Sequence, residues 1–161
     1  MNPAEEIVKF WLQHHGYFVM SSIHVPRGQN KEIDILAIHE KEGRRKHIEV
    51  QVSVHSLNFK RTPQMTALYY KEEKFEHPKV LQEVHNRFGG DFSYEKELVL
   101  GEVSLKGKDV IIPLTDECKS LGITVIPFSK ILKEVATELG TGTHLNPIIK
   151  AVQLCNKFLC T

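Results

Sequence analysis

The chain has 161 residues, of which 41% are hydrophobic and 25% are charged, and its formal net charge is +1 at pH 7. These values exclude a disordered chain and are typical of a globular domain that is large enough to bury a core. No apolar run approaches the roughly 18 residues of a membrane span, and the start MNPAEEIVKF is acidic, unlike a signal peptide. We therefore expect an intracellular, cytoplasmic protein with no membrane association.

The near-neutral charge does not by itself indicate a nucleic-acid-binding protein, because phosphate contacts need a local basic face. The cysteines do not indicate a disulfide framework either, since Cys118, Cys155 and Cys160 are odd in number and show no paired spacing. Cys155 and Cys160, taken together with His144, match no spacing typical of a zinc site.

The first half of the chain predicts one helix followed by three strands. Residues 3–15 predict a helix, because Pro3 suits a first turn, acids follow it, and apolar residues recur at helical spacing up to Gly16. Tyr17 to Val25 predicts a strand, and the turn PRGQN closes it. Two further strands, at 32–39 and 46–54, flank the charged turn EKEGRR.

The second half predicts alternating helices and strands. Thr62 and Pro63 suit the cap and first position of a helix that runs to about Phe75. The remaining expected elements are a helix from Pro78 to Gly89, a strand at 97–104, a turn at 106–108, a short strand at Val110–Pro113, a short helix at 116–120, a strand at 123–128, and helices at 129–139 and 146–159. This order predicts a single α/β domain, residues 1–161, with a mixed central β-sheet flanked by helices.

Two acids lie inside strands that otherwise consist of core residues. Side chains alternate along a strand, so Asp34 shares a face with Leu36, while Glu49 shares a face with Gln51. If the two strands form a hairpin, their apolar faces must coincide, because a one-residue slip would place the acids against Ile and Val. One allowed register pairs Asp34 with Gln51 and another pairs Asp34 with Glu49. Either register brings the three side chains together, with Cβ atoms roughly 5–8 Å apart.

Two partly buried carboxylates at that distance repel one another, and a divalent cation between them removes the penalty. Mg²⁺ or Mn²⁺ takes carboxylate and carbonyl oxygens, so Asp34, Glu49 and the backbone carbonyl of Val50 are candidate ligands. The alternative is a hairpin whose acid-bearing face is exposed to water, which is common in antiparallel sheets.

The stretches AEEIVKFWLQHHGY, EIDILAIH and HIEVQVS, within residues 4–53, resemble the PD-(D/E)XK nuclease superfamily. Within it, the chain is most similar to archaeal Holliday-junction resolvases and related small bacterial endonuclease-like proteins. The resemblance implies a restriction-endonuclease-like fold with an αβββααβ core, extended here by a C-terminal strand and helices. It implies a metal-dependent endonuclease that cuts nucleic acid, with DNA favoured over RNA. Similar resolvases act as dimers, so a homodimer is expected by analogy.

The resemblance, carried over by position, implies that Glu5, Asp34 and Glu49 are the metal-binding acids. Glu5 is chosen because it lies eleven residues before Gly16, and Glu6 is the alternative. Gln51 lies where the family usually has a catalytic Lys. Its amide can position the attacking water but brings no positive charge. Lys31 or Lys60 could supply the missing cation, and a catalytically inactive module that binds nucleic acid or a protein partner is the alternative function.

Several further side chains are candidates for contacts with nucleic acid. The basic ones are Lys31, Arg44, Arg45, Lys60 and Arg61. Two tyrosines, Tyr69 and Tyr70, either contact nucleic acid or pack inside the domain. Lys71 and Lys74 are near them in the sequence. His47 and His55 flank the third strand and are open as candidates for a general base.

Overall fold

The fold is described from a computed structural model in residues 2–27, 30–52, 62–101, 111–137 and 146–159. The elements in chain order are α1 (Pro3–His14), β1 (Tyr17–His24), β2 (Glu32–His39), β3 (Arg45–Gln51), α2 (Pro63–Tyr69), the π-helical segment η1 (Tyr70–Phe75), α3 (Pro78–Phe88), β4 (Glu95–Leu100), α4 (Ile111–Ser120), β5 (Ile123–Pro127), α5 (Phe128–Thr137) and α6 (Pro147–Leu159). The mixed α/β class predicted from the sequence is confirmed.

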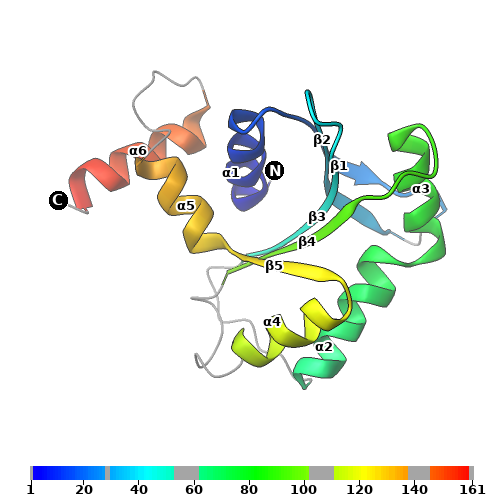
Figure 1. Cartoon of the computed structure of the whole chain (residues 1–161). Helices are drawn as coiled ribbons and strands as arrows, with labels where there is room; N and C mark the ends of the chain where they lie inside the picture. The colour runs from blue at the N-terminus through cyan, green and yellow to red at the C-terminus, as the bar shows by residue number, and fades with distance from the viewer. Residues whose placement is uncertain (1, 28–29, 53–61, 102–110, 138–145, 160–161) are drawn as a thin grey trace.

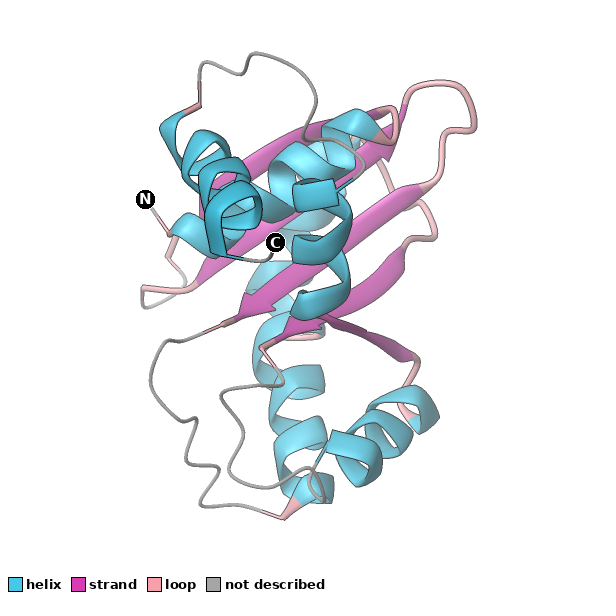
Figure 2. Ribbon diagram, turned by 90° about the vertical axis from the view of Figure 1, so that its left-hand side faces the viewer, coloured by secondary structure: helices cyan, strands magenta, loops and turns pink. Residues whose placement is uncertain are grey.

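The five strands form one mixed sheet in the order β1-β2-β3-β4-β5. The pairs β1–β2 and β2–β3 are antiparallel, whereas β3–β4 and β4–β5 are parallel. Helices α1, α5 and α6 cover one face, and α2, α3 and α4 cover the other (Figure 1). Figure 2 views the sheet from the α1–α5–α6 side, with the strands behind these helices. Strands β3, β4 and β5 end at the same edge of the sheet, which we call the carboxyl edge.

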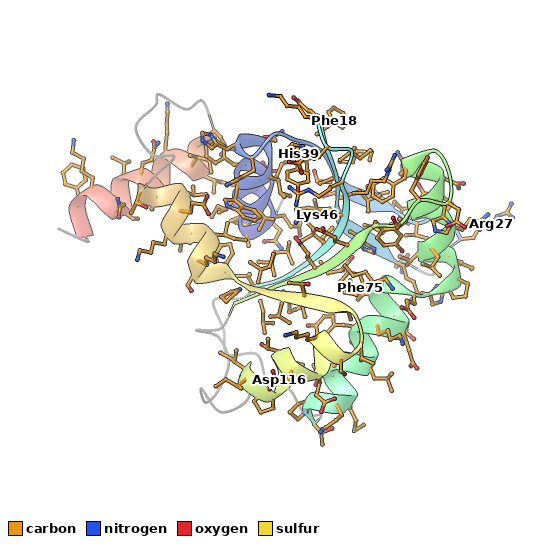
Figure 3. All side chains as sticks on the ribbon, in the orientation of Figure 1. Phe18, Arg27, His39, Lys46, Phe75 and Asp116 are labelled. Atoms are coloured by element: carbon orange, nitrogen blue, oxygen red, sulfur yellow. The ribbon has the colours of Figure 1, made fainter. Side chains whose placement is uncertain are left out.

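Alternation along the strands gives each face its own core. Ile35 and Ile48 pack against α1, α5 and α6, while their neighbour Leu36 packs against α3. Leu98 and Phe75 belong to a third cluster, beneath α2 and α4. Figure 3 shows Phe75 between the sheet and the helices on that side. Because helices cover both faces, the acid-bearing face of β2 and β3 is not a solvent-exposed surface.

One predicted element is wrong. Residues 111–113 belong to helix α4 and not to a short strand, and Val110 lies outside the described residues. A short apolar run such as VIIP does not distinguish a strand from a buried helix by periodicity. Pro113 lies in the first turn of α4, where backbone N–H groups have no partner within the helix, so proline is tolerated there.

The other predicted boundaries differ by a few residues. Strand β4 begins at Glu95, and the turn predicted at 106–108 lies outside the described residues. The helix predicted from Thr62 to Phe75 is present, but its second half is a π-helix. None of the helices in the described ranges is both long and apolar enough to cross a membrane.

Candidate metal and phosphate site

The register of the β2–β3 hairpin decides which acids meet. Ile35 pairs with Ile48 and Leu36 with His47, so the same register continued by one residue sets Asp34 opposite Glu49. The loop explains why this register is adopted: the His39 N–H donates to the Arg44 carbonyl at 2.8 Å and closes four residues between them. Of the two registers left open by the sequence, the hairpin has the one that pairs the acids directly.

Asp34 lies at the carboxyl edge, where β2 and β3 stop exchanging backbone hydrogen bonds. Its Oδ2 accepts a hydrogen bond from the Val50 N–H at 2.7 Å. Burial raises the pKa of Asp34 to about 7, and the charge of Glu49 adds to the rise, while the Val50 hydrogen bond and the charge of Lys74 oppose it. Asp34 therefore changes its ionisation near neutral pH.

Glu49 is almost completely buried and is held from two sides. Its side chain is 2% exposed; Oε1 lies 3.0 Å from Nε2 of His47, and Oε2 lies 2.9 Å from Nζ of Lys74. His47 is itself fully buried, and its ring packs edge-on against Phe75 with centroids 4.8 Å apart. The alternative of a water-exposed acid face is therefore wrong for Glu49.

Lys74 is the cation of the site, and sequence reasoning assigned it only a general place near nucleic acid. Burial disfavours the Lys74 ammonium, but the charge and hydrogen bond of Glu49, together with Asp34, outweigh burial and raise its pKa. Lys74 lies in the π-helical segment η1, four residues after the buried Tyr70 and one before the buried Phe75. Helical spacing of about four residues therefore places Lys74 on the same face as Tyr70, toward the sheet. The spacing does not say which acid it meets there, and the contact with Glu49 is decided by the packing of the helix on β3.

Glu5 acts on the site through its charge. It lies in the first turn of α1, and burial raises its pKa, with Glu32 and Glu49 adding to the rise and a hydrogen bond from Asn2 opposing it. In the described part of the chain, no hydrogen bond or ion pair joins Glu5 to either acid of the hairpin. The fallback residue Glu6 instead accepts a 3.5 Å hydrogen bond from the side chain of Asn146.

The backbone of Val50 faces Asp34. The Gln51 carbonyl accepts a hydrogen bond from the Gly101 N–H at 3.0 Å, so it points toward β4. Successive residues of a strand point their backbone groups to opposite neighbours, and the N–H and C=O of one residue point the same way. The Val50 carbonyl therefore lies on the β2 side, as its N–H does. Gln51, two residues after Glu49, is half-buried at the end of β3.

Of the predicted basic residues that the structure describes, Lys31 lies near the acids, whereas Arg44 and Arg45 do not. Arg44 pairs with Glu42 at 2.5 Å, and the Arg45 guanidinium lies 3.8 Å above the Phe92 ring. Both lie at the turn end of the hairpin, about 13–17 Å along β3 from Glu49. Lys31 lies at the acid end, with Nζ 2.6 Å from Oε2 of Glu73. Lys60, Arg61 and His55 lie outside the described residues.

The candidate ligands are of the chemical kind that a hard divalent cation prefers. Two carboxylates and a backbone carbonyl are the oxygen ligands that Mg²⁺ accepts, with waters completing its shell. No group of three or more His, Cys, Asp or Glu side chains in the described ranges is arranged to hold a metal. The set is therefore limited to Asp34, Glu49 and the Val50 carbonyl, with Lys74 as the neighbouring positive charge.

Comparison with known proteins assigns no function to this site. No family model and no curated protein matches the chain. The crystal structure of AF1548, a protein of unknown function, is similar, with a TM-score of 0.48 and 19% sequence identity. The match covers 80% of this chain and 59% of that one, so the chain spans about three fifths of AF1548. Support for a function therefore comes from the arrangement of Asp34, Glu49 and Lys74.

Proposed function

We propose that the protein is a metal-dependent phosphodiester hydrolase, an endonuclease with DNA as its favoured substrate. One observation carries the proposal: Asp34 and Glu49 meet at the carboxyl edge of the sheet, and Lys74 pairs with Glu49 there. Paired carboxylates in a half-buried site cost free energy unless cations balance them. A partly buried carboxylate with a strongly raised pKa and a charged partner, at the wall of a pocket, is a candidate for a functional site.

Each group has a chemical role in this proposal. Asp34, Glu49 and the Val50 carbonyl would hold Mg²⁺ or Mn²⁺, which when bound supplies a polarised water and neutralises charge on the scissile phosphate. The Gln51 amide orients the attacking water, as it can both donate and accept. Lys74 supplies the fixed positive charge that Gln51 lacks and stabilises the negative charge that develops on phosphorus.

The resemblance to the PD-(D/E)XK superfamily supports the same assignment. It rests on Asp34, Glu49 and Gln51 in order along adjacent strands, and on Glu5 in the first helix. The departure at Gln51 matters less if the cation comes from Lys74, 25 residues after Glu49 in the chain.

A second function is favoured by a separate observation. Oε1 of Glu49 lies 3.0 Å from His47, and Oε2 forms an ion pair with Lys74 although it has no hydrogen-bond partner in the described residues, so Lys74 balances the buried charge without a metal. A module that binds nucleic acid or a protein without cleaving it would have this property. It predicts binding that survives loss of Asp34.

The deciding experiment is cleavage of labelled single-stranded, duplex and four-way-junction DNA and of RNA, with Mg²⁺, Mn²⁺ or EDTA. We expect cleavage that requires the metal and falls by about 100-fold or more in Asp34→Asn. Asp116→Asn, an exposed acid on α4 (Figure 3), is the matched control and should cleave like the wild type. Full activity in Asp34→Asn would contradict the assignment. Folded wild type that cleaves nothing in either metal would favour the binding module.

A further inference from the structure

A pocket of about 350 Å³ opens beside the acid pair, between the start of β2 and the α2–η1 helix. Its walls include Lys31, Glu32, Tyr69 and Glu73, together with Asp34 and Lys74 of the proposed site. This volume lies near the lower end of small-molecule pockets, which span about 300–1,000 Å³. It suits a group the size of one nucleotide and not a double helix. A larger hollow between α5 and α6 lies on the other face of the sheet.

The charges of the pocket argue against a free polyanion as its ligand. Lys31 and Lys74 carry the positive charge, and each is already paired with a carboxylate, at 2.6 Å and 2.9 Å. Glu32, Asp34 and Glu73 contribute three acids to the same walls. A second phosphate would gain little attraction here, whereas a neutral group with polar edges meets both donors and acceptors.

Tyr69 gives the pocket a flat apolar wall. It is the last residue of α2 and is 40% exposed, and its ring lies 5.7 Å from that of the buried Tyr70 in an edge-on arrangement. Tyr70 therefore anchors one side of the Tyr69 ring. A ring fixed in this way, in a pocket whose walls also offer polar donors and acceptors, is a stacking platform for a nucleobase.

We infer that this pocket takes the base of one unpaired nucleotide, next to the phosphate that the proposed metal at Asp34 would bind. In a duplex, a base is stacked on both faces and cannot reach Tyr69 without leaving the stack. The substrate class is therefore single-stranded or locally unpaired nucleic acid. The position of the scissile phosphate rests on the proposed function, whereas binding of the base does not.

The test is binding of a labelled twelve-residue oligothymidine and of a duplex of equal length, measured by fluorescence anisotropy. Ca²⁺ replaces Mg²⁺, because it takes the same oxygen ligands. Tyr69→Ala should weaken oligothymidine binding roughly tenfold, the effect of losing one stacked base, and leave duplex binding unchanged. Tyr69→Phe keeps the ring and should bind like the wild type. An oligouridine arm distinguishes RNA from DNA as the source of the base.

Leu68→Ala is the matched control, since Leu68 is the neighbouring residue of α2 and is similarly exposed, at 43%. It should not change the affinity for either oligonucleotide. If Tyr69→Ala unfolds, Tyr69→Leu keeps apolar volume without an aromatic face and should show the same tenfold loss. Equal affinity of wild type and folded Tyr69→Ala or Tyr69→Leu for oligothymidine would overturn the inference, as would an equal loss for the duplex.

The outcome is separable from that of the nuclease assay. Metal-dependent cleavage with no effect of Tyr69→Ala on binding would leave the nuclease standing and remove the base pocket. Loss of oligothymidine binding in Tyr69→Ala, with no cleavage by the wild type, would leave the base pocket on a module that does not cut.

Discussion

At the scale of single residues, the ionisation of Asp34 makes the stability of the folded protein depend on pH. Its pKa is raised from 3.8 to about 7, first by burial and then by Glu49. The folded state therefore binds the Asp34 proton more tightly than the unfolded state does. The stability that this proton contributes is complete below pH 3.8 and is lost as the pH rises through about 7.

Asp34→Asn should therefore stabilise the protein at alkaline pH. The amide oxygen can still accept the Val50 N–H, and the variant carries no charge to repel Glu49. We expect a gain in the free energy of unfolding of about 2 kcal/mol at pH 8, less than the full pKa shift implies because the half-buried group is partly screened by solvent. The gain should shrink toward zero near pH 4. Urea denaturation across this range measures it; a gain independent of pH would contradict the assigned pKa, and Asp116→Asn should show none.

At the scale of elements, the site depends on the helix formed by α2 and η1, which carries Tyr69 and Lys74. Thr62 caps this helix: its hydroxyl accepts a hydrogen bond from the Met65 N–H at 3.2 Å, and Pro63 follows at the first position. The end of the same helix is fixed by Phe75, which is completely buried. Both ends of the helix are therefore held, and Lys74 lies between the buried Tyr70 and Phe75, on the side of the helix that meets Glu49.

Removing the cap should loosen this helix. Thr62→Ala should lower the free energy of unfolding by about 1 kcal/mol, because the Met65 N–H loses its partner. Thr62→Ser keeps the hydroxyl and should lose only a few tenths. Thermal denaturation of the two variants makes the comparison, and equal destabilisation by both would show that the cap does not stabilise the helix.

At the scale of the whole molecule, a divalent cation should stabilise the folded protein through the acid pair. The unfolded chain does not bring Asp34 and Glu49 together, so a cation that binds only the folded state raises its stability. The gain is about 2.7 kcal/mol at a metal concentration of 100 times Kd. For a chain of this length that corresponds to a rise in Tm of about 5–10 °C.

This rise in Tm should depend on pH. We expect a larger rise with Mg²⁺ or Mn²⁺ at pH 8 than at pH 5.5, because the ligand form of Asp34 is the ionised one. Differential scanning fluorimetry at both pH values measures the rise, with Asp116→Asn as control. The absence of any shift at pH 8, or an equal shift in Asp34→Asn, would argue against metal binding by the acid pair.

The sequence by itself determined the order of the elements, apart from the short strand predicted at 110–113, and the face of the hairpin on which the acids lie. Alternation along β2 and β3 is a local property, and the cost of placing Asp34 or Glu49 against the apolar face excludes half of the registers. The short strand predicted at Val110–Pro113 was wrong because a run of four apolar residues has no period to read. Local patterns thus predicted the acid pair but left its exact pairing open.

The tertiary structure alone decided what surrounds that pair. Glu49 is buried because helices from later in the chain cover its face, and the pKa of Asp34 is raised for the same reason. Lys74 meets Glu49 from a helix and lies 25 residues later in the chain, whereas Arg44 lies at the far end of the hairpin although it is closer in sequence. Burial and charge pairing depend on contacts between residues far apart in the chain, and no periodicity within one segment encodes them.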